Sequence, residues 1–369
     1  MRLPHANSRT VSTPPPATDP AQPGPSTPAA PAPRKKRRWK RIALIATIAF
    51  VLLAVITRIQ FARATRGLDS RPNPTSTYEE ALKRFEAFVG PEPESALLPE
   101  CRSILLDHGT KRPRVAVLLH GLTNCPQQFR ELATRLHADG WNVLVPLLPR
   151  HGRADRLSEN LTPMKAEEMR ELSDTAVDIA TGLGEEVVVA GLSAGGVAAA
   201  WIAQNRPEVS RSVLIAPALG FIPTKGRRLN ELFFFLLPLL PDIKTDRFAV
   251  DPNAPTHTYP GFSSRSLGQL LRLSGATLDA ASKRPPAVQS VALLTSEQDT
   301  AVNRVMAWQL ISLWRMKGVR ILDTYDFPKS EGVQHDMIDP AQTYAKTPLV
   351  YPVVLGLMGA SDPDLPASR

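Results

Sequence analysis

Large apolar side chains are nearly absent from the first 33 residues, where ten prolines stand among Ser, Thr, Ala and Gln. A segment of this composition cannot bury enough apolar surface to fold. We therefore expect residues 1–41 to form a disordered, proline-rich tail that ends in a polybasic block.

An excess of positive charge is missing from most of the chain, although the formal net charge is +9. Residues 1–71 hold thirteen Lys or Arg and two acids, whereas residues 72–369 hold thirty-one bases and thirty-three acids. The larger part is thus nearly neutral, which argues against a basic surface that binds nucleic acid.

Only one long uncharged run is found near the N-terminus. It extends from Ile42 to Thr57, with seven basic residues just before it and three soon after it. With its flanks it approaches the ~20 residues that cross a bilayer, so we expect a transmembrane signal anchor at residues 42–61. The charge bias favours a cytoplasmic N-terminus and a C-terminal domain outside the cytoplasm. Cleavage is an alternative, because Ala62-Arg63-Ala64 is similar to a signal-peptidase site.

Cysteine is also scarce, since Cys101 and Cys125 are the only two. In an oxidising compartment such a pair is a candidate disulfide, whereas in the cytosol it is interpreted as two buried thiols. The expected export of the domain favours a Cys101–Cys125 bridge.

The remaining chain has the pattern of an α/β fold. We interpret residues 62–100 as a proline-rich linker with a short helix near residues 78–88. After it, short apolar runs alternate with amphipathic stretches, which predicts a mostly parallel sheet flanked by helices over residues 101–369. Strands are expected at residues 103–106, 115–119, 142–145, 187–190, 212–215, 290–294 and 319–325. A turn at His108-Gly109-Thr110 predicts that the first two strands form an antiparallel hairpin at the edge.

One stretch, residues 218–286, has no clear strand and contains the apolar block Leu232–Leu240. It is too long for a structureless loop inside a compact domain. We therefore expect an inserted helical cap there.

The strongest chemical signal is Gly191-Leu192-Ser193-Ala194-Gly195, which lies between an expected strand and a small-residue helix. A serine on a sharp strand-to-helix turn needs flanking residues with almost no side chain, because strand and helix come close there. This context predicts that Ser193 is a nucleophile. The alternative is a glycine-rich turn with an incidental serine.

A second glycine-bearing turn, His120-Gly121-Leu122-Thr123, ends the strand at 115–119. Acyl transfer needs two backbone donors aimed at the developing oxyanion. We expect these donors to be the N–H groups of Leu122 and Ala194. His120 is interpreted as a structural residue of the turn.

The base must follow the serine in this type of fold, and only His257 and His335 do so. His335 lies in a loop after the last expected strand, whereas His257 falls within the cap, so His335 is preferred. A carboxylate must orient the base, and Asp299 follows the strand at 290–294. The rival carboxylates are Glu297, Asp326 and Asp336.

Together these segments resemble the α/β-hydrolase superfamily, and His120–Pro126, the Ser193 turn and the Asp299 and His335 loops are most similar to its monoacylglycerol lipase and carboxylesterase branch. The resemblance implies ester hydrolysis without metal or cofactor under a helical cap. Pro149-Arg150-His151-Gly152 is similar to a loop of that branch, with Arg150 replacing its first glycine, which makes His151 a structural residue. The first hundred residues have no counterpart.

The sequence therefore predicts a membrane-tethered serine esterase or lipase-like hydrolase that acts on a hydrophobic acyl ester and has no nucleic-acid partner. Peptidases, thioesterases and acyltransferases use the same triad and stay open as alternatives. A membrane-tethered binding protein without turnover is a further alternative.

Overall fold

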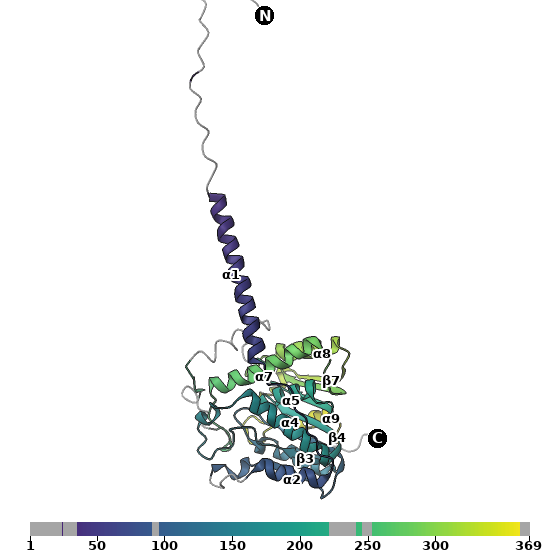
Figure 1. Cartoon of the computed structure of the whole chain (residues 1–369). Coiled ribbons are helices and arrows are strands. Elements are labelled where there is room, and N and C mark those ends of the chain that lie inside the picture. The colour runs from purple at the N-terminus through teal and green to yellow at the C-terminus, as the bar shows by residue number, and fades with distance from the viewer. Residues whose placement is uncertain (1–23, 25–34, 91–95, 221–240, 246–252, 362–369) are drawn as a thin grey trace, which may run out of the picture. The chain divides into compact units, whose positions relative to one another are not determined.

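The computed structural model describes residues 24, 35–90, 96–220, 241–245 and 253–361. The chain divides into two compact units, residues 1–59 and 60–369. The expected disordered tail at 1–41 lies outside the described residues except for residue 24 and residues 35–41, and residues 35–41 are helical instead of disordered. Helix α1 (Lys35–Ala64) contains those residues (Figure 1).

Helix α1 exposes large apolar side chains, among them Trp39, Ile45 and Phe50. Within the described residues, no helix combines the length and the apolar character needed to cross a membrane. The transmembrane helix expected at residues 42–61 is therefore not confirmed. A helix is present there, but its uncharged run covers only Ile42 to Thr57 and charged residues stand on both sides.

The second unit contains a seven-stranded sheet in the order β1-β3-β2-β4-β5-β6-β7. Each expected strand segment is confirmed, with shifts of a few residues at the ends. The strands are β1 (Ile104–Leu106), β2 (Arg112–Leu119), β3 (Asn142–Val145), β4 (Gly184–Leu192), β5 (Val209–Ile215), β6 (Ser290–Ser296) and β7 (Arg320–Phe327).

The antiparallel edge strand is β1, but the expected hairpin with β2 is wrong. Strand β1 pairs with β3, with Ile104 opposite Val145, and β3 lies parallel to β2. The reason is the crossover through α3 (Arg130–Ala138), which brings β3 into the position beside β2 and displaces β1 outward.

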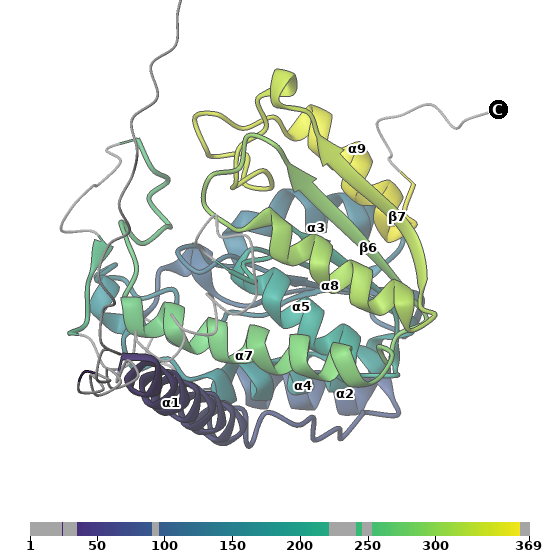
Figure 2. The same ribbon diagram turned by 90° about the horizontal axis from the view of Figure 1, so that it is seen from above.

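Helices cover both faces of the sheet (Figure 2). Along β2, Val115, Val117 and Leu119 belong to one apolar core and Ala116 and Leu118 to the other, as the two-residue repeat of a strand requires. The first core contains α4 (Ala166–Leu183), α5 (Ala194–Asn205), α7 (Ser264–Lys283) and α8 (Arg304–Met316), and the second contains α3 and α9 (Thr347–Met358). Both faces of this mostly parallel sheet are therefore buried under helices.

Helix α7 corrects the boundary of the expected cap at 218–286. Its buried Leu270, Leu273 and Leu278 belong to the core that also contains α5, so α7 is part of the layer covering the sheet. Residues 221–240 and 246–252, which include the apolar block of the expected cap, lie outside the described residues.

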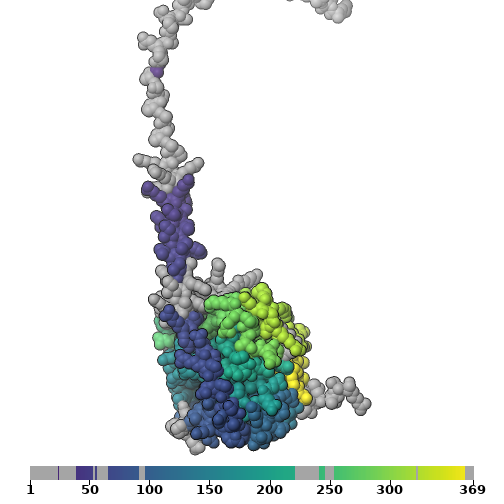
Figure 3. Space-filling view, turned by 45° about the vertical axis from the view of Figure 1, so that its right-hand side comes forward, coloured from purple at the N-terminus to yellow at the C-terminus, as the bar shows by residue number. Residues whose placement is uncertain are grey.

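The segment expected as a linker, residues 62–100, also differs. Leu68 is buried, and its carbonyl accepts a hydrogen bond from Trp201 Nε1 (2.9 Å). Helix α2 (Tyr78–Val89), capped by the side chain of Thr77, packs against α4. Figure 3 shows this dark-blue segment lying on the surface of the domain. The folded unit therefore begins well before Cys101, because this segment buries apolar side chains of its own.

Candidate active site

Ser193 lies on the sharp turn between β4, which ends at Leu192, and α5, which begins at Ala194. Its φ of 57° and ψ of −110° are unusual for a residue with a side chain. A Cβ at Gly195 would lie 1.9 Å from the Leu119 carbonyl oxygen, and one at Gly191 would lie 2.2 Å from the Gly195 carbonyl oxygen. Strand and helix can approach this closely only because both positions are glycine.

The structure brings Ser193, His335 and Asp299 together. His335 Nε2 lies 2.9 Å from Ser193 Oγ, and His335 Nδ1 lies 2.7 Å from Asp299 Oδ2. The Asp299 side chain is 2% exposed and that of His335 is 23% exposed. A buried carboxylate on Nδ1 keeps the proton on that nitrogen, which leaves Nε2 free to accept a proton from the serine.

The two loops that carry the partners of Ser193 follow neighbouring strands. Asp299 comes after β6 and His335 after β7. Asp299 Oδ1 accepts a hydrogen bond from the backbone N–H of Ala301 (2.8 Å), which fixes the carboxylate within its own loop. The carboxyl ends of parallel strands thus place both groups at the edge of the sheet where Ser193 stands.

The rival residues have other partners. His257 is buried and its Nε2 lies 2.8 Å from Asp339 Oδ2. Glu297 accepts from the backbone N–H of Lys329, and Asp326 accepts from Thr295 Oγ1. The fourth rival, Asp336, bonds amide side chains and not the imidazole of His335.

The two expected oxyanion donors, Leu122 and Ala194, lie in different segments near Ser193. Leu122 and Ser193 line one cavity of about 210 Å³, which also includes His335. Ala194 is the first residue of α5, where backbone N–H groups have no partner inside the helix. The helix end can therefore donate to a negative oxygen beside Ser193.

Two buried histidines shape the Leu122 turn. His120 Nε2 accepts from the backbone N–H of Leu148 (3.0 Å), and its Nδ1 donates to the Gly121 carbonyl (2.9 Å). Burial lowers the pKa of His120 well below its ordinary value, and the nearby His151 adds to that effect. His120 is thus neutral with both ring nitrogens bonded. The ring of His151 contacts the Leu122 carbonyl, so both histidines support the turn.

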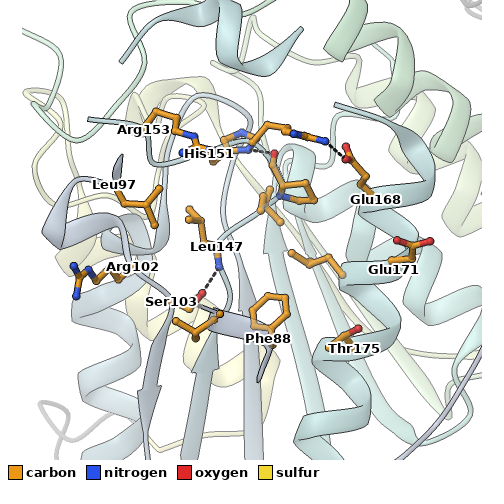
Figure 4. Close-up of a pocket in the computed structure, with 16 residues that line it drawn as sticks. Phe88, Leu97, Arg102, Ser103, Leu147, His151, Arg153, Glu168, Glu171 and Thr175 are labelled. Atoms are coloured by element: carbon orange, nitrogen blue, oxygen red, sulfur yellow. Dashed lines mark hydrogen bonds and ion pairs between the residues drawn. The ribbon is translucent and has the colours of Figure 1, made fainter. Parts of the chain in front are cut away.

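Apolar side chains form part of the wall of the Ser193 cavity, among them Leu192, Phe262, Leu267 and Val302. A larger cavity of about 560 Å³ lies between α2, α4 and the loop at 147–153, and it contains none of the triad residues (Figure 4).

In the described part of the chain, no group of three or more His, Cys, Asp or Glu is arranged to hold a metal ion.

Three polar residues around the site were not singled out from the sequence: Asn124, Gln128 and Asp339. Asn124 and Asp339 bond each other across 215 residues of chain, and Gln128 reaches Asp336 across 208. The only sequence signal is their nearness to the Leu122 turn and to His335, which does not distinguish them from other loop residues.

Cys101 and Cys125 form a disulfide, with Cα atoms 5.2 Å apart and both side chains buried. The bridge joins the turn before β1 to the residue that follows Asn124. It therefore restrains the loop that contains Leu122.

Replacing both cysteines with serine is expected to lower the free energy of unfolding by about 3 kcal/mol. The bridge closes a loop over a separation of 24 residues, which reduces the number of conformations open to the unfolded chain. Urea denaturation of the double variant measures this loss. Reduced wild-type protein serves as the control and should show a similar midpoint. An unchanged midpoint in both would contradict a stabilising role.

The chain is similar to a known protein family and to several known proteins. The model of a family described as the alpha/beta hydrolase family matches residues 116–364. The chain is similar to the 30 kDa subunit of magnesium chelatase from Rhodobacter capsulatus, with 31% identity over 210 residues, which covers 56% of this chain and 66% of that subunit, just under two thirds of its length. It is also similar to a thermostable monoacylglycerol lipase from a Bacillus species, with 26% identity over 227 residues, covering 58% of this chain and 82% of the lipase.

Among solved structures, the monoacylglycerol lipase of Paleococcus ferrophilus has a similar fold, with a TM-score of 0.50 and 18% sequence identity. The match covers 70% of this chain and all of that chain. At this identity the likeness shows a shared fold.

Proposed function

The chain belongs to the alpha/beta hydrolase family, near its monoacylglycerol lipase and esterase branch, and we propose that it is a serine hydrolase that cleaves carboxylic esters through an acyl-enzyme on Ser193. One observation carries the proposal: His335 bridges Ser193 Oγ and Asp299 Oδ2. Nucleophile, base and orienting carboxylate in this order are the arrangement that acyl transfer requires.

In the proposed reaction, Ser193 Oγ bonds to the acyl carbon while its proton passes to His335 Nε2. The N–H groups of Leu122 and Ala194 donate to the carbonyl oxygen as it becomes negative. The ester bond then breaks, and His335 returns the proton to the departing alcohol. Water then gives a proton to His335 and attacks the acyl carbon. The bond from that carbon to Ser193 Oγ breaks, and His335 returns the proton to Oγ as the carboxylic acid leaves. Asp299 stabilises the imidazolium in both halves of the reaction.

The substrate that this site favours has an apolar acyl group. The cavity beside Ser193 is lined by Leu122, Leu192, Phe262 and Leu267. Burying acyl methylene groups against these side chains provides about 0.8 kcal/mol for each CH₂. Peptide and thioester substrates share the triad, so the comparison of ester, thioester and amide analogues separates these chemistries.

A fluorophosphonate probe tests the proposal directly, because it phosphonylates a serine only when a base activates it. Wild-type protein is expected to be labelled on Ser193, and Ser193→Ala is expected to remain unlabelled. Heat-unfolded wild-type protein is the control for non-specific reaction. An unlabelled native protein would favour a binding protein that retains the fold without turnover.

The location of the domain is a further part of the proposal: it lies outside the cytoplasm, with the basic residues before Ile42 on the cytoplasmic side. The Cys101–Cys125 disulfide supports this location, because such bridges persist in oxidising compartments. Alkaline phosphatase fused after Arg369 should be active in cells. An inactive fusion, with an active cytoplasmic reporter at the same position, would reverse the orientation.

A further inference from the structure

A group of polar side chains joins the two loops that meet at Ser193. One loop, residues 121–124, contains the proposed oxyanion donor Leu122. The other contains His335, the adjacent Asp336 and, three residues further on, Asp339. Asn124, at the end of the first loop, is 2% exposed, and Asp339 in the second loop is 1% exposed. Groups this deeply buried are stable only when their hydrogen bonds are made.

The amide of Asn124 connects both carboxylates. Its Nδ2 lies 3.1 Å from Asp336 Oδ2 and 3.1 Å from Asp339 Oδ2. An amide nitrogen has two hydrogens, so each carboxylate receives one of them. The Oδ1 atom accepts from the backbone N–H of Cys125 (2.8 Å). The side chain is thus held from both ends.

A second bridge runs through Gln128. Its Oε1 accepts from the backbone N–H of Gly121 (2.8 Å), and its Nε2 donates to Asp336 Oδ1 (2.8 Å). Gln342 Nε2 donates to the other oxygen of Asp336 (2.7 Å). The backbone next to Leu122 is therefore tied to the residue next to His335 by one side chain and one carboxylate.

The carboxylates of Asp336 and Asp339 lie close enough for their negative charges to repel each other. Burial and the charge of Asp339 raise the pKa of Asp336, and hydrogen bonds from Gln342 and Gln128 oppose the rise. His257 Nε2 contacts Asp339 (2.8 Å). Hydrogen bonds to a carboxylate are stronger than those between neutral groups, so a fully bonded cluster holds its members in one arrangement.

We propose that Asn124, held by Asp336 and Asp339, is a positioning residue. It keeps the Leu122 N–H and the imidazole of His335 in their positions relative to Ser193 Oγ. The inference rests on the proposed hydrolase function. Because a displacement of about 1 Å in a catalytic group lowers turnover about 100-fold, Asn124→Ala should lower kcat by about 10- to 100-fold. KM should change little, since the loss falls on the transition state.

The chain offers a matched control in Asn142, an equally buried amide at the start of β3. Its Nδ2 donates to the carbonyls of Thr110 and Leu183 (2.8 Å each), and its Oδ1 accepts from the backbone N–H of His108 (2.9 Å). It lies at the amino end of its strand, away from the edge that holds Ser193. Asn142→Ala should lower the melting temperature but leave kcat within about twofold of wild type.

The experiment measures kcat, KM and melting temperature for p-nitrophenyl butyrate hydrolysis by full-length wild type, Asn124→Ala and Asn142→Ala. Asn124→Ser keeps one donor, so it should lose less kcat than Asn124→Ala, and it provides the same comparison if the alanine variant does not fold. A graded loss of kcat at position 124 that Asn142→Ala does not show supports the inference.

Two results overturn it in distinguishable ways. If wild type is labelled by the fluorophosphonate and turns over, but Asn124→Ala and Asn124→Ser keep kcat within twofold of wild type or lose no more than Asn142→Ala, positioning by Asn124 is wrong while the hydrolase function stands. If wild-type protein is neither labelled nor active, the proposed function fails and the positioning role fails with it.

Discussion

Ser193→Ala and His335→Ala are each expected to lower kcat for p-nitrophenyl butyrate by about a million-fold. In the proposed reaction Ser193 and His335 act as one unit across a 2.9 Å contact, so removing either one should end the acyl-enzyme route. The double variant should therefore be no slower than either single variant. Stopped assays with high enzyme concentration, calibrated against buffer alone, measure the remaining rate.

The carboxylates of the Asp299 loop provide the control for this prediction. Asp299→Asn keeps the shape of the side chain but favours the wrong imidazole tautomer, and it should lower kcat by about 10⁴-fold. The side chain of Glu297, two residues earlier, accepts from the backbone N–H of Lys329 and pairs with Arg304 (3.9 Å), so Glu297→Gln should retain wild-type kcat. Substantial turnover in His335→Ala would contradict the assignment and direct attention to His257.

Arg206→Met is expected to lower the free energy of unfolding by about 3–5 kcal/mol, because the buried Asp174 and Asp178 lose their shortest ion pairs. Their longer pairs, with Arg170 (3.5 Å) and Arg84 (3.8 Å), remain. Arg206 follows α5 and is fully buried. Its Nη1 lies 3.0 Å from Asp174 Oδ1 and its Nη2 lies 2.6 Å from Asp178 Oδ1. These carboxylates also accept from the backbone N–H groups of Arg71 and Asn73, so the variant should also loosen the segment before α2.

The loss should depend on pH in a defined direction. Burial raises the pKa of Asp178, and the guanidinium of Arg206 opposes this rise. Without Arg206 the folded-state pKa rises further above the ordinary value of 3.8, so folding is destabilised above 3.8 and not below it. The difference between variant and wild type should therefore be larger at pH 7 than near pH 4.

Urea denaturation at both pH values measures the effect of Arg206→Met. Lys283→Met is the control, because the ion pair of Lys283 with Asp279 involves a lysine side chain that is 60% exposed, and its removal should change stability by less than about 1 kcal/mol. Equal losses in the two variants would show that the buried pairs of Arg206 have no special role.

Local patterns explain why much of the fold was predictable. Buried strands such as β3 and β4 are short apolar runs bounded by turn residues, and α8 is an amphipathic stretch that begins after a capping Asn303. Such features depend on neighbours within a few residues. The hairpin of β1 with β2 was wrong because the choice of a partner strand depends on where the intervening helix returns the chain.

The sequence by itself determined where the strands lie along the chain, and it singled out Ser193, His335 and Asp299, which the structure brings together. Small residues around a turn and the succession of groups along the chain are local or ordinal features. Only the tertiary structure decided how Leu68–Val89 packs and which groups surround Arg206 and Asn124. Arg206 meets Asp178 across 28 residues and Asn124 meets Asp336 across 212. Contacts at such separations arise from the packing of whole elements, and no local pattern encodes them.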